Sequence, residues 1–223
     1  MNTLNHIAFI MDGNGRWGKK KKKNRNFGHL KGVETVKKIV EFSIKLKVPF
    51  ISFYVFSTEN WKRPKNEINF LFNLVSSYFL KELNNVIKNG IKIKIIGEIN
   101  RLPKKLKEIL KKTVDKTKNN NKIEVILALN YGSKKELINT FKKINKNKIT
   151  ETFISKNLYT KHIPDPDILI RTGGKKRLSN FMLWQLAYAE LYFLNKLWPD
   201  FSPIDLKKII IDYYKIKRNF GKI

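Results

Sequence analysis

The chain has 223 residues, of which 42% are hydrophobic, so it can bury one good core and a single domain over residues 1–223 is expected. It has no cysteine, which excludes disulfides and thiolate metal sites, and it has no apolar run of transmembrane length, so a cytoplasmic protein is expected. The formal net charge of +29 would suit a nucleic-acid partner, but the lysines are scattered through nearly every segment, as a general composition bias would place them.

Strand-like and helix-like segments alternate along the chain. Short apolar runs predict strands over residues 6–11, 50–56, 91–96, 123–129, 167–170 and 189–193. Apolar spacing and length predict helices over residues 33–47, 66–88, 103–118, 134–144 and 203–214. This alternation predicts an α/β fold with a mostly parallel central sheet of about six strands, flanked by helices on both faces.

Polar residues follow four of these strands. They are Asp12, residues 57–60, Asn130 and Arg171. Ligands of parallel sheets bind beyond the carboxyl ends of the strands, so these residues should meet at one edge of the sheet.

The loop after the first strand, Asp12-Gly13-Asn14-Gly15-Arg16-Trp17, predicts a site for a phosphate ester. Its glycines would let backbone N–H groups approach phosphate oxygens closely. Asp12 alone would oppose that, because two like charges about 4 Å apart repel by roughly 4 kcal/mol at an effective dielectric near 20. A divalent cation between them reverses the sign, so the loop predicts a magnesium-bound phosphate.

Arginine usage supports this interpretation. Only seven of the 47 basic residues are arginines, and five of them fall in three short motif-like segments: Arg16, Arg25, Arg63, Arg171 and Arg177. The planar guanidinium grips phosphate bidentately, whereas lysine acts as a point charge, so several such arginines predict more than one phosphate group. The lysine run over residues 19–23 could be either a solvated loop or an electropositive mouth beside this site.

Two other nucleotide-binding motifs are not expected. Residues 13–18 match the pattern GxGxxG, but Trp17 and five lysines follow where that motif requires a helix, and no acidic residue closes a second strand at the distance usual for that motif. The pattern GxxxxGK[ST] does not occur. The sequence therefore predicts neither a nicotinamide or flavin enzyme nor a P-loop nucleotidase.

The phosphate loop, with Phe27-Gly28-His29 after it, resembles the first motif of the cis-prenyltransferases, the undecaprenyl diphosphate synthase family. Further blocks resemble that family in the same order: residues 54–64, 130–132, 167–174, 177–185, 189–193 and 197–201. One departure is Ser133-Lys134, where the family usually has glycine and arginine. The DDxxD motifs of the unrelated helical trans-prenyltransferases are absent.

The resemblance implies an Mg²⁺-dependent transferase that adds isopentenyl diphosphate in cis to an allylic diphosphate such as farnesyl diphosphate. It implies undecaprenyl diphosphate as the product, a lipid-carrier precursor for peptidoglycan, and a homodimer as the active form. It also leaves room for a peripheral contact with the inner face of the membrane at product release. A shorter-chain or dolichol-type enzyme, and more remotely a basic nucleic-acid-binding protein, remain as alternatives.

The resemblance also assigns roles to individual residues. It assigns catalysis to Asp12 and Asn60, and metal binding to Asp12 and Glu190, the latter from the same or the partner subunit. It assigns the allylic diphosphate to Gly13, Asn14, Gly15, Arg16, Arg25 and Arg63, and isopentenyl diphosphate to Arg171, Arg177 and Ser179. It adds Trp17, His29, Ser57, Thr58, Glu59 and Trp61 as further substrate-binding residues, and places Glu67 near the reacting centre. The proton acceptor is left open.

The long helix expected over residues 66–88 is apolar almost all round. A helix at the surface would show a single apolar stripe. Two apolar faces suit a helix that packs on the sheet and also lines a hydrophobic tunnel, where burial of lipid gains about 0.8 kcal/mol per CH₂. A core helix or a dimer helix would have the same pattern.

Overall fold

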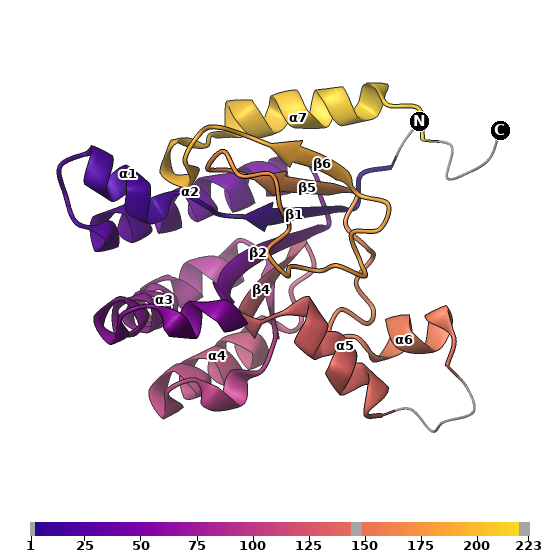
Figure 1. The fold of residues 1–223 in the computed structure, drawn as a ribbon, viewed down its shortest axis with the longest axis horizontal. Coiled ribbons are helices and arrows are strands. Elements are labelled where there is room, and N and C mark those ends of the chain that lie inside the picture. Colours follow the sequence, from indigo (N-terminus) through magenta and orange to yellow (C-terminus); the bar gives the residue numbers. More distant parts are fainter. Residues whose placement is uncertain (1–2, 144–148, 219–223) are drawn as a thin grey trace.

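The central feature of the fold is a parallel six-stranded sheet, seen in a computed structural model that describes residues 3–143 and 149–218 (Figure 1). Its strand order is β3-β4-β2-β1-β5-β6, and all neighbouring strands are parallel. The strands are β1 (His6–Ile10), β2 (Phe50–Ser57), β3 (Ile91–Ile96), β4 (Ile123–Tyr131), β5 (Ile168–Arg171) and β6 (Glu190–Phe193). The predicted α/β fold and its six strands are confirmed.

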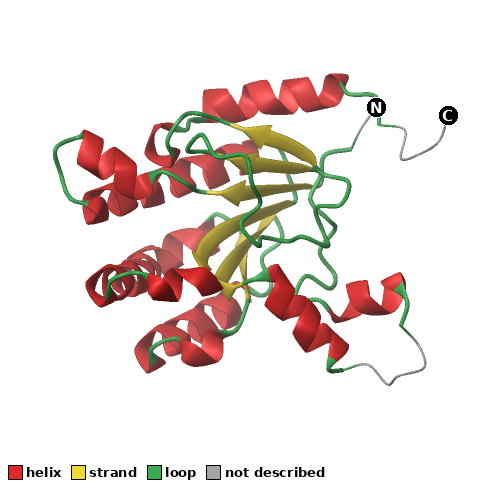
Figure 2. Cartoon of the chain, in the orientation of Figure 1, coloured by secondary structure: helices red, strands yellow, loops and turns green. Residues whose placement is uncertain are grey.

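The two faces of the sheet are covered differently (Figure 2). One face packs on four helices: α2 (Arg25–Lys45), α3 (Lys65–Lys88), α4 (Lys104–Thr117) and α7 (Pro203–Lys215). The other face packs on the two connections from β4 to β5 and from β5 to β6, the first of which contains α5 (Ser133–Phe141) and α6 (Glu151–Asn157). In β1 the side chains alternate accordingly, with Ile7 and Phe9 in the helix-covered core and Ala8 and Ile10 in the other.

Two helices were not expected from the sequence. The first, α1 (Asn14–Lys20), begins within the glycine-rich loop, so the argument that no helix opens there is wrong. Helix α2 also begins earlier than predicted, at Arg25, where the Asn24 side chain accepts a hydrogen bond from the Phe27 amide at 2.9 Å. The other unexpected helix is α6. The helix predicted over residues 134–144 corresponds to α5, and its predicted last residue, 144, lies outside the described residues.

Close backbone packing holds α1 in place despite its glycines and lysines. Gly13 precedes the helix with φ = 111°, a left-handed conformation that favours glycine. Gly28 of α2 lies so close to α1 that an added Cβ would overlap the carbonyl oxygen of Asn14. This contact positions the glycine-rich loop beyond the carboxyl end of β1.

The described ranges also contain three short 3₁₀ helices: η1 (Thr58–Lys62), η2 (Ile99–Arg101) and η3 (Trp198–Asp200). Across the ranges described, none of the helices is both long and apolar enough to cross a lipid bilayer.

Candidate active site

A polar pocket of about 360 Å³ lies beyond the carboxyl ends of β1, β2 and β5. It gathers 13 of the side chains or glycines that the sequence placed at a substrate site, from segments far apart in the chain. They are Asp12, Gly13, Asn14, Gly15, Arg16, Arg25, His29, Ser57, Asn60, Arg63, Arg171, Arg177 and Ser179. All five arginines of the motif-like segments are present, whereas Arg101 and Arg218 lie outside the pocket lining.

Asp12 links two of these arginines. Its Oδ1 accepts a hydrogen bond from Arg16 Nη2 at 3.1 Å, and its Oδ2 accepts one from Arg171 Nη2 at 2.9 Å. Arg16 also donates to the carbonyl oxygen of Gly173 at 2.8 Å. The carboxylate therefore sits between an arginine of α1 and an arginine at the end of β5.

A second carboxylate, Glu67 on α3, lies outside the pocket lining but contacts three of the lining residues. It pairs with Arg25 at 3.0 Å and with Arg63 at 3.2 Å, and it lies 3.5 Å from His29 Nε2. Burial alone would raise the pKa of Glu67, but hydrogen bonding and charge from Arg25 and Arg63 hold it below its ordinary value. Burial, with the positive charge of Arg63, lowers the pKa of His29 to about 4, so its imidazole is neutral at pH 7.

Arg171 is the most deeply buried of the five arginines, with 3% of its surface exposed. Its Nη1 donates to Ser179 Oγ at 2.7 Å and to the carbonyl oxygen of Arg177. Its Nε has no hydrogen-bond partner. Ser179 is held by a left-handed backbone (φ = 52°), so the turn after β5 wraps its polar groups around this guanidinium.

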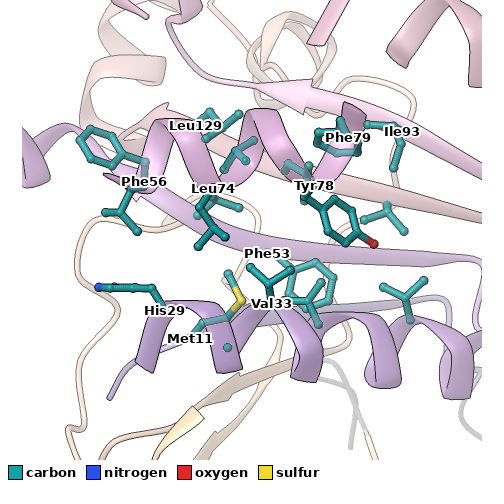
Figure 3. Close-up of a pocket in the computed structure, with 18 of the residues that line it drawn as sticks. Met11, His29, Val33, Phe53, Phe56, Leu74, Tyr78, Phe79, Ile93 and Leu129 are labelled. Atoms are coloured by element: carbon teal, nitrogen blue, oxygen red, sulfur yellow. The ribbon is translucent and has the colours of Figure 1, made fainter. Parts of the chain in front are cut away.

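An apolar cavity of about 140 Å³ continues from the polar pocket between α2, α3 and the sheet (Figure 3). Figure 3 shows His29 and Met11 at one end of this cavity and Phe79 and Ile93 at the other. Helix α3 lines it through Leu71, Phe72, Leu74, Val75, Tyr78, Phe79 and Val86. The apolar character of the predicted helix 66–88 is thus partly that of a cavity wall.

Five residues line both the pocket and the cavity: Met11, Asn14, His29, Val55 and Leu71. A single ligand can therefore place an anionic head among the arginines and an apolar tail along α3. Met11, Val55, Leu71 and the pocket residue Tyr54 were not predicted as site residues. Apolar side chains carry no sequence signal that separates a cavity wall from a core.

Several predicted site residues lie outside the pocket lining. Trp17 donates from Nε1 to Asp200 at 2.7 Å and stacks on Phe27. Glu59 accepts from Asn180 at 2.9 Å. Thr58 lies beside Gly132, where its hydroxyl would be 2.6 Å from an added Cβ.

The aromatic neighbour of the pocket, Trp61, belongs mainly to the core. It packs on Phe56 and Phe72, and it donates to Asn130 Oδ1 at 2.7 Å. Asn130 lies within β4 rather than after it and also donates to the carbonyl oxygen of Glu98, so it is not brought into the pocket lining.

Glu190 lies apart from Asp12 within this subunit. It is the first residue of β6 and pairs in register with Ile168, whereas Arg171, which contacts Asp12, pairs with Phe193 at the other end of the strand. Its side chain lies 3.8 Å from Arg218. Within one chain, Glu190 and Asp12 therefore do not share a metal site.

The residues present fit a magnesium ion that is bound mainly through substrate. Mg²⁺ usually keeps several waters and takes only one or two protein carboxylates together with substrate phosphates. Asp12 supplies such a carboxylate at the edge of an arginine-lined pocket, with its side chain 29% exposed. The described ranges contain no group of three or more His, Cys, Asp or Glu side chains that could hold a metal without substrate.

The fold and the site together define a class: a parallel α/β protein with an anion pocket at the strand ends and an apolar cavity behind it. The Prenyltransf family model, described as "Putative undecaprenyl diphosphate synthase", matches residues 10–221. The chain belongs to this family, and it is a prenyltransferase of the cis-elongating type.

Relatives and solved structures agree with this assignment. The chain is 44% identical to an isoprenyl transferase of Rickettsia typhi, covering 100% of both chains, and 45% identical to one of Helicobacter pylori, covering 98% of that protein. A crystal structure of a "probable undecaprenyl diphosphate synthase" from Campylobacter jejuni matches with a TM-score of 0.85 and 36% identity over 100% of both chains. Lavandulyl diphosphate synthase from Lavandula x intermedia, in complex with dimethylallyl diphosphate, matches with a TM-score of 0.93 and 30% identity over 98% of both chains.

Proposed function

We propose that this chain condenses isopentenyl diphosphate in cis onto an allylic diphosphate, with farnesyl diphosphate as the primer and undecaprenyl diphosphate as the product. The observation that carries the proposal is the join between an arginine-lined pocket and an apolar cavity at Met11 and His29. An isoprenoid diphosphate has this same division into an anionic head and an apolar tail. The product would serve as a lipid-carrier precursor for peptidoglycan synthesis.

In the reaction the allylic C1–O bond breaks, diphosphate leaves, a new C–C bond forms from isopentenyl diphosphate to C1, and a proton is lost. We assign Arg16, Arg25 and Arg63, which line the pocket, to the allylic diphosphate. The first turn of α1 would contribute as well, because anions favour helix N-termini. Guanidinium groups that are fixed before reaction stabilise the charge that develops on the leaving diphosphate.

On the other side of the pocket, we assign Arg171, Arg177 and Ser179 to isopentenyl diphosphate. Because Asp12 touches both Arg16 and Arg171, the two diphosphates would lie on either side of it. Asn60 is held by its cap contact, in which Oδ1 accepts from the Ser57 amide at 3.1 Å, and it orients groups near the reacting carbons.

Asp12 would hold magnesium together with the substrate phosphates, and the ion would supply positive charge against the diphosphates. A homodimer is supported by β6, which is an edge strand and carries an exposed apolar side chain, Leu191. In a dimer, Glu190 of the same strand could reach a partner's site rather than its own. We place the enzyme in the cytoplasm, with peripheral contact at the inner face of the membrane when product is released.

The test is incubation of the pure protein with farnesyl diphosphate and radiolabelled isopentenyl diphosphate, followed by thin-layer chromatography of the product. A polyprenyl product is expected with Mg²⁺, and its chain length distinguishes an undecaprenyl enzyme from a shorter-chain or dolichol-type enzyme. The proposal fails if no product forms under either condition, with detergent or without it.

Asp12→Ala should abolish turnover and leave substrate affinity within about tenfold, because Arg16 and Arg171 remain in place. Chelation of Mg²⁺ should have the same effect on the native protein. The matched control is Asp115→Ala, at an exposed aspartate on α4, which should keep full activity. A near-native rate for Asp12→Ala would show that the carboxylate does not serve a metal.

A further inference from the structure

The longest run of charge in the chain lies beside the candidate site. The lysines of residues 19–23, at the end of α1 and in the following turn, are all exposed. No acidic residue occurs between Asp12 and Glu34, although eight lysines and arginines do. Most surface lysines of this chain lack such isolation; α4, for example, carries Glu108 and Asp115 among its lysines. The run is therefore a cluster of positive charge with no acidic residue near it in the sequence.

A partly apolar groove adjoins this run. It has a volume of about 320 Å³ and is lined by Lys23, Asn24, Asn26, Phe27, Leu30 and Phe70. Leu30 is 46% exposed, so a large aliphatic side chain faces solvent next to the lysines. We call the lysine run and this groove together the basic–apolar patch.

The groove of the basic–apolar patch lies on the same two helices as the apolar cavity, α2 and α3. Phe27 and Leu30 are on the first turns of α2, and Phe70 is on α3. One residue further along α3, Leu71 lines both the polar pocket and the cavity. Figure 3 shows Val33 of α2 and Leu74 of α3 on the two sides of the cavity. The groove therefore lies near the amino ends of the two helices that enclose the apolar cavity, on the side where His29 and Leu71 join the cavity to the polar pocket.

We propose that the basic–apolar patch docks on an anionic lipid bilayer, so that the end of the α2–α3 pair faces lipid. This rests on the proposed function, whose product has a long apolar tail that must leave water. Anionic lipid attracts clustered lysines at roughly 1 kcal/mol for each lysine near the surface. The apolar groove favours lipid over nucleic acid as the partner, because acyl chains can insert into it whereas a nucleic-acid backbone has no apolar part to place there.

The test is cosedimentation of the full chain with vesicles of phosphatidylcholine, with and without phosphatidylglycerol. The first variant replaces the run: Lys19→Gln, Lys20→Gln, Lys21→Gln, Lys22→Gln and Lys23→Gln. Its control removes the same charge from five exposed lysines at the far end of α4 and the turn after it: Lys111→Gln, Lys112→Gln, Lys116→Gln, Lys118→Gln and Lys122→Gln. At roughly 1 kcal/mol for each lysine, the first variant should lose at least about a hundredfold, and up to about a thousandfold or more, in partitioning onto anionic vesicles, and the control less than about threefold.

A second pair of variants tests the apolar part. Leu30→Gln should weaken vesicle binding about fivefold, whereas Ile138→Gln, at an exposed isoleucine of α5, should not change it. Equal losses in the two lysine variants, or binding that is insensitive to Leu30→Gln, would overturn the proposal. So would a run-dependent affinity for RNA that exceeds the affinity for anionic vesicles. Vesicle binding needs no turnover, so inactivity in the separate detergent assay would count against the proposed function alone.

Discussion

Arg171→Lys tests whether the shape of the guanidinium, rather than its charge, holds isopentenyl diphosphate. Arg171 makes three hydrogen bonds through its two Nη atoms, to Asp12, Ser179 and the carbonyl oxygen of Arg177. A lysine ammonium keeps the charge but cannot reproduce this planar fork while also gripping phosphate bidentately. Loss of one hydrogen bond to a charged group costs about 2–3 kcal/mol, which raises the dissociation constant of isopentenyl diphosphate by about 30- to 140-fold.

The assay is calorimetric titration of Arg171→Lys with isopentenyl diphosphate and, separately, with farnesyl diphosphate. Affinity for the allylic substrate should change much less, because Arg16, Arg25 and Arg63 are intact. The matched control is Arg101→Lys, at an exposed arginine outside the pocket that stacks over Trp61 at 4.8 Å. An isopentenyl diphosphate affinity within about threefold of native would refute the reasoning, provided that thermal melting shows the variant to be folded.

Two further predictions concern the cavity and the buried histidines. Val75→Phe fills part of the 140 Å³ cavity, so product chains should become shorter by thin-layer chromatography. Burial lowers the pKa of both His6 and His29 to about 4, so between pH 6.5 and 4 the unfolded chain binds protons that the folded chain does not. The free energy of unfolding, measured with urea, should fall over that window by up to about 3 kcal/mol for each histidine.

Each of these predictions has an outcome that contradicts it. The cavity argument is wrong if Val75→Phe gives the same products as Leu80→Phe, a change at an exposed residue of the same helix. The pH argument is wrong if stability is flat from pH 6.5 to 4. It also requires His6→Gln to reduce the slope of stability against pH.

Sequence periodicity predicted the sheet well because buried parallel strands are short apolar runs that end at polar residues. It missed α1 because Gly15 and Gly18 are poor helix formers and because the run of lysines that ends the helix repels itself. That helix is stabilised by tertiary contact with Gly28 of α2, which local sequence does not reveal. The start of α2 was missed for a related reason, since its first turns face the phosphate loop and carry few apolar residues.

The candidate site was predictable where it consists of charged groups at strand ends. Arginines stand out against a lysine-rich background, and the structure brings five of them into one pocket. Trp17 and Glu59 point away from the pocket, to Asp200 and Asn180. Their place in a motif does not show this, because neighbouring residues of the same motif do line the pocket. Glu190 shows another limit, because strand direction places it at the amino end of β6.

The polar pocket also carries a cost to folding. In the part of the chain that the structure describes, the buried side-chain polar atoms without a hydrogen-bond partner include Asn14 Oδ1 and Arg171 Nε, and both residues line the pocket. Each such atom costs about 1–3 kcal/mol, so this corner of the fold is less stable than its packing alone would make it. A diphosphate held by the surrounding arginines would offset part of that cost on binding. Substrates should therefore protect the protein against heat and proteolysis, and substitutions that stabilise the empty protein here would weaken its grip on diphosphate.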